Sequence, residues 1–174
     1  IGIIREEKSP QDSRVTLSPQ HCKTLIGRGY DIVVQPSGVR CFKDSDYTAL
    51  GVPLQEDLND RTILIGVKEV PISSLIADKT YFFFSHTIKE QVYNRDLLLA
   101  VIEKNITLID YEVLTDPNGA RVIAFGKFAG MVGAHNGIWA FGNRTGLFSL
   151  PIVKFLYDYS EAQEIYKSIQ MPNI

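Results

Sequence analysis

Short apolar segments recur along this chain, and each one is followed by charged or polar residues. They are rich in Ile, Val, Leu and Phe and cover residues 1–4, 31–35, 62–67, 81–84 and 106–110. Continuous apolar runs of this length are typical of strands that are buried on both faces of a parallel sheet. The pattern therefore predicts a parallel sheet, with the aromatic run at 81–84 in its core.

Helix signals separate these apolar segments. Ser18 followed by Pro19 is typical of a helix start, because the serine side chain caps the first turn and proline needs no hydrogen bond there. Gly29 and Gly51 are typical of helix ends, where a left-handed backbone is often needed. We expect helices over residues 18–28, 45–50, 90–104, 127–142 and 160–168.

Three later segments carry more specific expectations. In the helix predicted at 90–104, an apolar stripe should face the core, formed by Leu97, Leu98, Val101 and Ile102. The segment 127–142 is rich in glycine and alanine, so we expect a helix that packs closely against another element. His135 lies in this helix without a titratable neighbour, which indicates a structural role. The turn signal at 116–119 predicts a hairpin whose second arm opens at Arg121.

Strands that alternate with helices predict an α/β fold, a Rossmann-like (flavodoxin-like) parallel sheet with helices on both faces. We expect this substrate-binding domain at residues 1–143. Residues 144–174 are expected to form a helical connection that leads towards an NAD(P)-binding domain. No Gly-x-Gly-x-x-Gly sequence occurs in the chain, so we expect the cofactor-binding Rossmann domain to be absent from it.

Polar residues follow the predicted strands in a coherent way. Ligands of open α/β sheets bind beyond the carboxyl ends of the strands, so residues that follow a strand are candidates for function. Taken singly, each of these residues could be an ordinary surface charge, and Glu112 with Arg121 could form an exposed ion pair. Together they favour a site, and they are Arg14, Lys68, Glu69, His86, Gln91, Glu112 and Arg121.

This set of side chains suits an anionic substrate that undergoes proton transfer. An arginine fork binds a carboxylate through two hydrogen bonds, as expected of Arg14 and Arg121. Lys68 near other cations could act as a base, and His86 could exchange protons near neutral pH. Glu112 could hold or tune either cation.

Composition excludes several other functions. The formal charge of −2 gives no general attraction to nucleic acid, and no stretch is apolar enough to span a membrane. Only two cysteines are present, Cys22 and Cys41, without a CxxC pair or a cluster with histidine. This usage indicates a reduced, cytoplasmic protein without a metal site.

Several motifs in order along the chain resemble one known family. GVKEVP at 66–71, FSHTIKEQ at 84–91 and LIDYEVLTDPNGARVIAFG at 108–126 are similar to saccharopine dehydrogenases, including the lysine-ketoglutarate reductase branch. The opening residues, IGIIREEKSPQDSRVTLSP, also resemble alanine dehydrogenases and the N-terminal region of nicotinamide nucleotide transhydrogenases. The resemblance covers about residues 1–143.

The resemblance implies an NAD- or NADP-dependent oxidoreductase that acts on saccharopine, the secondary amine that joins lysine to 2-oxoglutarate. It implies Lys68 as general base and His86 as proton donor and acceptor. It implies that Glu112 adjusts these two groups, and that the substrate is lined by Arg14, Glu69, Gln91 and Arg121. Some members carry an arginine where this chain has Ala120, so the choice between NAD and NADP stays open.

Two other functions remain as alternatives. The chain could belong to an alanine dehydrogenase-like enzyme, or it could be a ligand-binding domain that has lost catalysis. The expected partners are an amino-acid substrate and the NAD(P)-binding domain of the same full-length protein, without nucleic acid or membrane. Homo-oligomer formation is left open, and the isolated chain is expected to be inactive.

Overall fold

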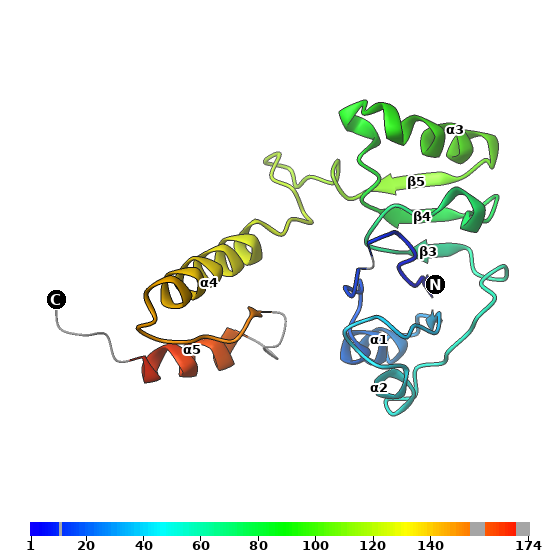
Figure 1. Ribbon diagram of the computed structural model, residues 1–174. Helices are drawn as coiled ribbons and strands as arrows, with labels where there is room; N and C mark the ends of the chain where they lie inside the picture. Colours follow the sequence, from blue (N-terminus) through cyan, green and yellow to red (C-terminus); the bar gives the residue numbers. More distant parts are fainter. Residues whose placement is uncertain (11, 154–158, 170–174) are drawn as a thin grey trace. The chain divides into compact units, whose positions relative to one another are not determined.

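The structure, a computed structural model, describes residues 1–10, 12–153 and 159–169 (Figure 1). Its contacts divide the chain into two compact units, Ile1–Ile123 and Ala124–Ile174. The expected domain boundary after residue 143 falls near the end of a helix in the second unit, and the assignment of 1–143 as a functional domain stays a prediction. Each unit is described by itself.

Unit 1 is built on a five-stranded parallel sheet, as the apolar runs predict. Its strands are β1 (Gly2–Ile3), β2 (Val33–Val34), β3 (Ile63–Ile65), β4 (Thr80–Phe83) and β5 (Thr107–Asp110). Their order is β2-β1-β3-β4-β5, the flavodoxin-like order, and all neighbouring pairs are parallel. The chain therefore changes direction across the sheet between β1 and β3, where such folds bind ligands.

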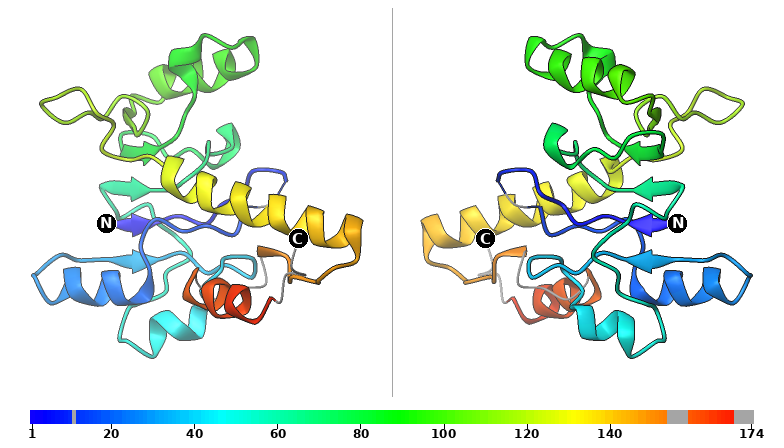
Figure 2. Two further views of the ribbon diagram at one scale, coloured as in Figure 1. Left: turned by 90° about the vertical axis from the view of Figure 1, so that its left-hand side faces the viewer. Right: turned by 90° about the vertical axis from the view of Figure 1, so that its right-hand side faces the viewer.

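Helices cover both faces of the sheet, as predicted. They are α1 (Pro19–Ile26), α2 (Asp44–Thr48) and α3 (Arg95–Glu103), and Figure 2 shows α3 on the other side of the strands from α1 and α2. One core cluster joins α1 and α2 to Ile3 and Val34. A second cluster joins α3 to Val33 and Phe83. Adjacent strand residues thus point to opposite helical layers.

The structure differs from the sequence prediction at the start of α3. The region predicted as one helix from residue 90 follows one 3₁₀ turn, η2 (Thr87–Lys89), and begins with another, η3 (Val92–Asn94). Glu90 between them has a φ of 52°, a left-handed conformation that a continuous α-helix cannot contain. The α-helix therefore begins only at Arg95.

The predicted apolar stripe of α3 is half wrong. Leu97 and Val101 are buried, together with Ala100, whereas Leu98 and Ile102 are exposed. Positions 97, 100, 101 and 104 share one side of a helix, so the buried stripe is rotated by about one residue from the predicted one. Periodicity alone could not choose between the two sides because both carry apolar residues.

A hairpin follows β5 at the predicted turn. Gly119 has a φ of 81°, which favours glycine, and Asp116 accepts hydrogen bonds from the backbone N–H groups of Asn118 and Ala120. The two arms pair through a single antiparallel bridge between Thr115 and Arg121. The hairpin thus fixes the backbone at Arg121 without adding a strand to the sheet.

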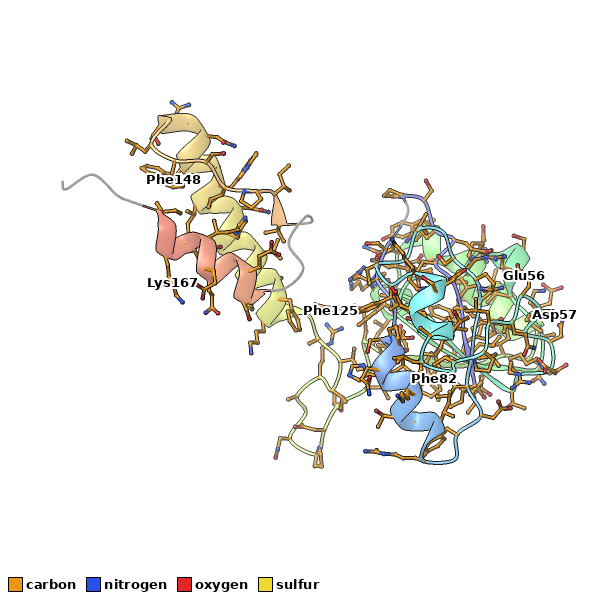
Figure 3. All side chains as sticks on the ribbon, turned by 90° about the horizontal axis from the view of Figure 1, so that it is seen from below. Glu56, Asp57, Phe82, Phe125, Phe148 and Lys167 are labelled. Atoms are coloured by element: carbon orange, nitrogen blue, oxygen red, sulfur yellow. The ribbon has the colours of Figure 1, made fainter. Side chains whose placement is uncertain are left out.

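Unit 2 contains α4 (Gly126–Thr145) and α5 (Tyr159–Ser168). His135 is buried, with one ring nitrogen 2.5 Å from the Tyr166 hydroxyl and the other 2.9 Å from the Pro151 carbonyl oxygen, which confirms its structural role. The predicted close packing of the α4 glycines holds at Gly142, where an added Cβ would lie 2.5 Å from the ring of Phe148. Figure 3 labels Phe148 in this unit.

Close packing of the other glycines of α4 stays a prediction. An added Cβ would meet no atom within 4 Å at the glycines of the preceding turns, Gly126, Gly130, Gly133 and Gly137. Among the helices of the described ranges, none is long and apolar enough to cross a membrane.

Candidate functional site

The site begins where β1 and β3 end side by side. Glu6 follows β1, and its carboxylate accepts hydrogen bonds from the backbone N–H groups of Val67 (2.7 Å) and Lys68 (2.8 Å), which follow β3. Burial raises the pKa of Glu6, although these two hydrogen bonds act in the opposite direction. The carboxylate therefore fixes the backbone that carries Lys68 at the switch point of the sheet.

Arg14 and Lys68 share an acidic neighbour, Asp12. Arg14 donates from Nε to Asp12 Oδ1 at 2.9 Å and from Nη2 to Oδ2 at 2.5 Å. This hydrogen-bonded pair lowers the pKa of Asp12, and the charge of Lys68 adds to the effect. In the described part of the chain, no carboxylate lies within 4.0 Å of the Lys68 amine. The amine is thus close to balancing charge without being tied into an ion pair.

Glu69 links the lysine segment to the histidine. Its side chain is buried, and Lys8 Nζ lies 2.7 Å from its Oε2. On the other side, His86 Nε2 lies 4.0 Å from Glu69 Oε1, which is too far for a direct hydrogen bond. Neither carboxylate oxygen receives a hydrogen bond of regular geometry from the described residues. A buried acceptor of this kind is suited to a polar group of a ligand.

His86 follows β4 and is held in an unusual backbone conformation. Its φ of 56° lies in the left-handed region, which is costly for a residue other than glycine and is found most often at functional sites. Its ring stacks on Phe84, with ring centroids 6.3 Å apart. Phe84 is buried, so the ring on which the imidazole stacks is held in place.

One carboxylate after β5 contacts both a histidine and a lysine. Glu112 Oε2 lies 2.9 Å from His86 Nδ1, and Glu112 Oε1 lies 2.9 Å from Lys89 Nζ. Lys89 Nζ is also 3.2 Å from His86 Nδ1. Glu112 therefore pairs with His86 and Lys89, and not with Arg121 as an exposed surface pair would require.

The contacts of Nδ1 indicate how the neutral imidazole is protonated. A carboxylate only accepts, so Nδ1 must carry the proton in order to bond Glu112. The lysine ammonium only donates, and it already has an acceptor in Glu112 Oε1. We therefore assign the Nδ1–H tautomer, which leaves the lone pair on Nε2, on the side of Glu69.

The paired state of Glu112 predicts a specific pH dependence of stability. Burial tends to raise the pKa of Glu112, but the hydrogen bonds from Lys89 and His86 outweigh it, and the pKa lies below its ordinary value of 4.5. A carboxyl group with a lowered folded-state pKa stabilises the fold above its unfolded-state pKa, and this contribution disappears as pH falls through the folded-state value.

We expect Glu112→Gln to lower the free energy of unfolding at neutral pH, with a difference from the wild type that shrinks as pH falls below about 4.5. Urea unfolding of both proteins between neutral and acidic pH measures this difference. Asp116→Asn, in the hairpin turn, serves as a comparison at a carboxylate without a cation within 4.0 Å in the described part of the chain. A Glu112→Gln difference that is independent of pH would contradict the proposed pairing.

Two of the predicted site residues, Arg121 and Gln91, make contacts other than those with Glu112 or Glu69. The Arg121 guanidinium carbon lies 5.8 Å from the centroid of the Phe84 ring, the ring that also stacks with His86. Gln91 instead accepts a hydrogen bond from the Tyr93 hydroxyl and lines a separate cavity of about 270 Å³ with Val92 and Leu98. Its role in substrate binding stays a prediction.

Four charged residues of the site were not among those predicted from sequence. Glu6 and Lys8 lie in the loop after the first strand, Asp12 lies two residues before Arg14, and Lys89 follows His86 by one turn. Their position after strands was visible in the sequence, but their partners were not. The described residues contain no group of three or more His, Cys, Asp and Glu side chains arranged to hold a metal ion.

The fold and the site define a flavodoxin-like α/β domain whose charged residues gather at the carboxyl ends of its strands. The model of the family "Alanine dehydrogenase/PNT, N-terminal domain" matches residues 2–132. This match covers most of the chain, and the chain belongs to that family. A solved L-alanine dehydrogenase is similar in structure, with a TM-score of 0.61, 25% identity, and coverage of 82% of this chain and 40% of that one.

Curated relatives are more similar in sequence. Alpha-aminoadipic semialdehyde synthase, mitochondrial, of Mus musculus is 41% identical over 144 residues, which cover 83% of this chain and 16% of the relative. Saccharopine dehydrogenase [NAD(+), L-lysine-forming] of Candida glabrata is 39% identical over 149 residues, which cover 79% of this chain and 39% of the relative. The predicted resemblance is confirmed, and the chain spans well under half the length of these relatives.

Proposed function

We propose that this chain is the substrate-binding half of an NAD(P)-dependent oxidoreductase that oxidises the secondary amine saccharopine. The arrangement of Lys68, Glu69, His86 and Glu112 at the carboxyl edge of the sheet supports this proposal most directly. The named activities of the fungal and mammalian relatives supply the substrate class. Within this proposal the chain itself provides substrate contacts and proton transfer.

Lys68 removes a proton from the substrate in this proposal. A secondary amine can lose hydride from the adjacent carbon only when its nitrogen holds a free electron pair, so the ammonium form must first be deprotonated. The Lys68 amine is the group proposed to accept that proton, and in the described part of the chain it is not held in an ion pair with a carboxylate within 4.0 Å. Glu6 holds the Lys68 backbone in place for this step through its hydrogen bond to the amide.

His86 acts on the imine that follows oxidation. Water adds to the C=N carbon, and Nε2 accepts one proton from that water. The C–N bond of the resulting carbinolamine breaks when the imidazolium returns that proton to the leaving nitrogen and the hydroxyl proton passes to water, which gives an amine and a ketone. Glu112 holds the ring through Nδ1 and stabilises the transient positive charge.

The nicotinamide of NAD or NADP would accept the hydride. Between Ile4 and Ser18, where dinucleotide-binding folds carry the glycine-rich turn that receives the cofactor's phosphates, the sequence has no glycine. The helix after this loop also starts with Pro19, which lacks an N–H group. We propose that another domain of the full-length protein binds the cofactor and that the isolated chain is inactive.

Carboxylate recognition falls to the two arginines in this proposal. Arg14 donates two hydrogen bonds to Asp12 and is positioned by them, and Arg121 is exposed beside Phe84. Substrate carboxylates bound at two separate points would orient the reacting C–H bond. The cost of this orientation is a large part of the barrier to hydride transfer.

The full-length protein that carries this chain tests the proposal. We expect reduced nicotinamide to form with saccharopine, and to be consumed with lysine and 2-oxoglutarate together, because the same proton transfers serve both directions. Alanine is the comparison substrate, since the family also includes alanine dehydrogenases. Turnover with alanine and none with saccharopine would reject the proposed substrate and favour the alternative.

We also propose a cytoplasmic location, which the free thiols of Cys22 and Cys41 support. The printed name of the mouse relative assigns that protein to mitochondria. Subcellular fractionation of the source cells, with an antibody against this chain, distinguishes the two locations.

A further inference from the structure

The proposed chemistry gives no role to the buried carboxylate of Asp110, which is hydrogen-bonded to the residue before His86. Asp110, the last residue of β5, is buried and accepts a hydrogen bond through Oδ2 from Ser85 Oγ at 2.5 Å. Through Oδ1 it accepts a second from the backbone N–H of Glu112 at 2.8 Å. Ser85 is completely buried and precedes His86. One side chain thus joins the ends of β4 and β5, which carry the two members of the His86–Glu112 pair.

Ser85 extends this connection to the far side of His86. Its Oγ accepts a hydrogen bond from the Thr87 backbone N–H at 3.1 Å and lies 2.7 Å from Thr87 Oγ1. With one hydrogen donated to Asp110 and two accepted, the serine hydroxyl uses its full capacity. Residues 85 and 87 are therefore fixed on both sides of His86, whose left-handed backbone needs such support.

Glu112 and Lys89 both lie near Nδ1 of His86, and their distances decide which of them bonds it. Glu112 Oε2, at 2.9 Å from Nδ1, is an acceptor and requires a proton on Nδ1. Lys89 Nζ, at 3.2 Å, is a donor and would require the proton on Nε2. A small displacement of Glu112 or of the ring exchanges the nearer partner. Only the first arrangement leaves Nε2 free to accept a proton.

We propose that Asp110 and Ser85 are positioning residues that set the tautomer of His86, by holding Glu112 closer to Nδ1 than Lys89 is. The geometric part of this inference stands on the structure, and its effect on turnover rests on the function proposed above. Loss of either residue releases Glu112 or the ring and moves the neutral imidazole towards the Nε2–H form. In that form His86 cannot act as a base at Nε2.

Ring ¹⁵N chemical shifts of His86 measure the tautomer directly in this 174-residue chain. We expect Nδ1–H in the wild type and a shift towards Nε2–H in Asp110→Asn and in Ser85→Ala, with a backbone amide spectrum that remains dispersed. Asp116→Asn is a control, because Asp116 also accepts hydrogen bonds from backbone N–H groups in a turn, but its partners are Asn118 and Ala120 of the hairpin. A folded Asp110→Asn or Ser85→Ala with the wild-type tautomer overturns the inference.

If neither variant folds, Thr87→Val decides, because it removes only the hydroxyl that contacts Ser85 from a partly exposed side chain. A shift towards Nε2–H supports the inference, and an unchanged tautomer overturns it. In the full-length enzyme, Asp110→Asn should lower kcat about tenfold or more while KM changes little. If the variants change the tautomer but the wild-type full-length enzyme does not turn over saccharopine, only the proposed function is rejected. If the wild-type enzyme turns over saccharopine but the variants keep its tautomer, only the positioning role is rejected.

Discussion

Replacing Lys68 with Met is expected to lower kcat for saccharopine oxidation by about 10²-fold or more in the full-length enzyme. Methionine has a similar length but cannot exchange a proton, so the substrate amine would have to lose its proton to water. We expect the thermal midpoint of unfolding to change little, because the Lys68 amine has no carboxylate within ion-pair distance in the described part of the chain. Steady-state kinetics and thermal unfolding of the same preparations measure both effects.

Lys23→Met is the matched control for this experiment. Lys23 is exposed on α1, on a helix that contributes no side chain to the site, so kcat should remain at the wild-type value. Wild-type turnover in Lys68→Met would show that the amine is not the base. If Lys68→Met and Lys23→Met both lose turnover and both unfold at a lower temperature, the loss of turnover would be due to lower stability.

Leu97→Ala should destabilise unit 1 by about 2–5 kcal/mol, since it removes a buried side chain and leaves a cavity against the sheet. Leu97 is 6% exposed and packs in the cluster that also contains Leu64 and Phe83. Urea unfolding followed by circular dichroism gives the free energy of unfolding. The same experiment examines which side of α3 faces the core.

The neighbouring residue provides a control in the same helix. Leu98 is 41% exposed, so Leu98→Ala should change the free energy of unfolding by no more than about 1 kcal/mol. Both substitutions make the same change in helix propensity, and they differ only in burial. An effect of Leu98→Ala equal to that of Leu97→Ala would mean that the outer side of α3 is also covered.

The site is held together by carboxylates that bond to residues following a neighbouring strand. Glu6 after β1 holds the amide of Lys68 after β3, and Glu112 after β5 holds the ring of His86 after β4. Each proposed catalytic residue is therefore held by a carboxylate that follows a neighbouring strand. This division lets the same sheet edge offer both proton exchange and fixed geometry, without a metal ion in the proposed chemistry.

The strands could be predicted because parallel sheets bury both faces of each strand, and this demand leaves continuous apolar runs in the sequence. The run at 62–67 contains β3, and the run at 81–84 contains most of β4. The start of α1 was equally predictable, because Ser18 caps the helix through its own side chain. In these places the cause of the structure lies within a few residues of its effect.

The site could be predicted only in part. The sequence placed Lys68, His86 and Glu112 after successive strands, and parallel strands bring such residues to one edge. It did not indicate that Glu112 contacts both His86 and Lys89. Nor did it indicate that Asp110 accepts hydrogen bonds from Ser85 and from the backbone of Glu112. Such contacts join side chains from different strands, and their distances depend on register and on loop conformation.

The sequence by itself determined the class of fold, the strands and the residue types that gather at their carboxyl ends. Only the tertiary structure decided which side of α3 is buried, where that helix begins, and which partner each charged group takes. The reason is physical. Apolar periodicity and helix caps act over a few residues, whereas the left-handed backbone at His86 and Glu90 and the bonds of Asp110 exist only once distant strands have paired.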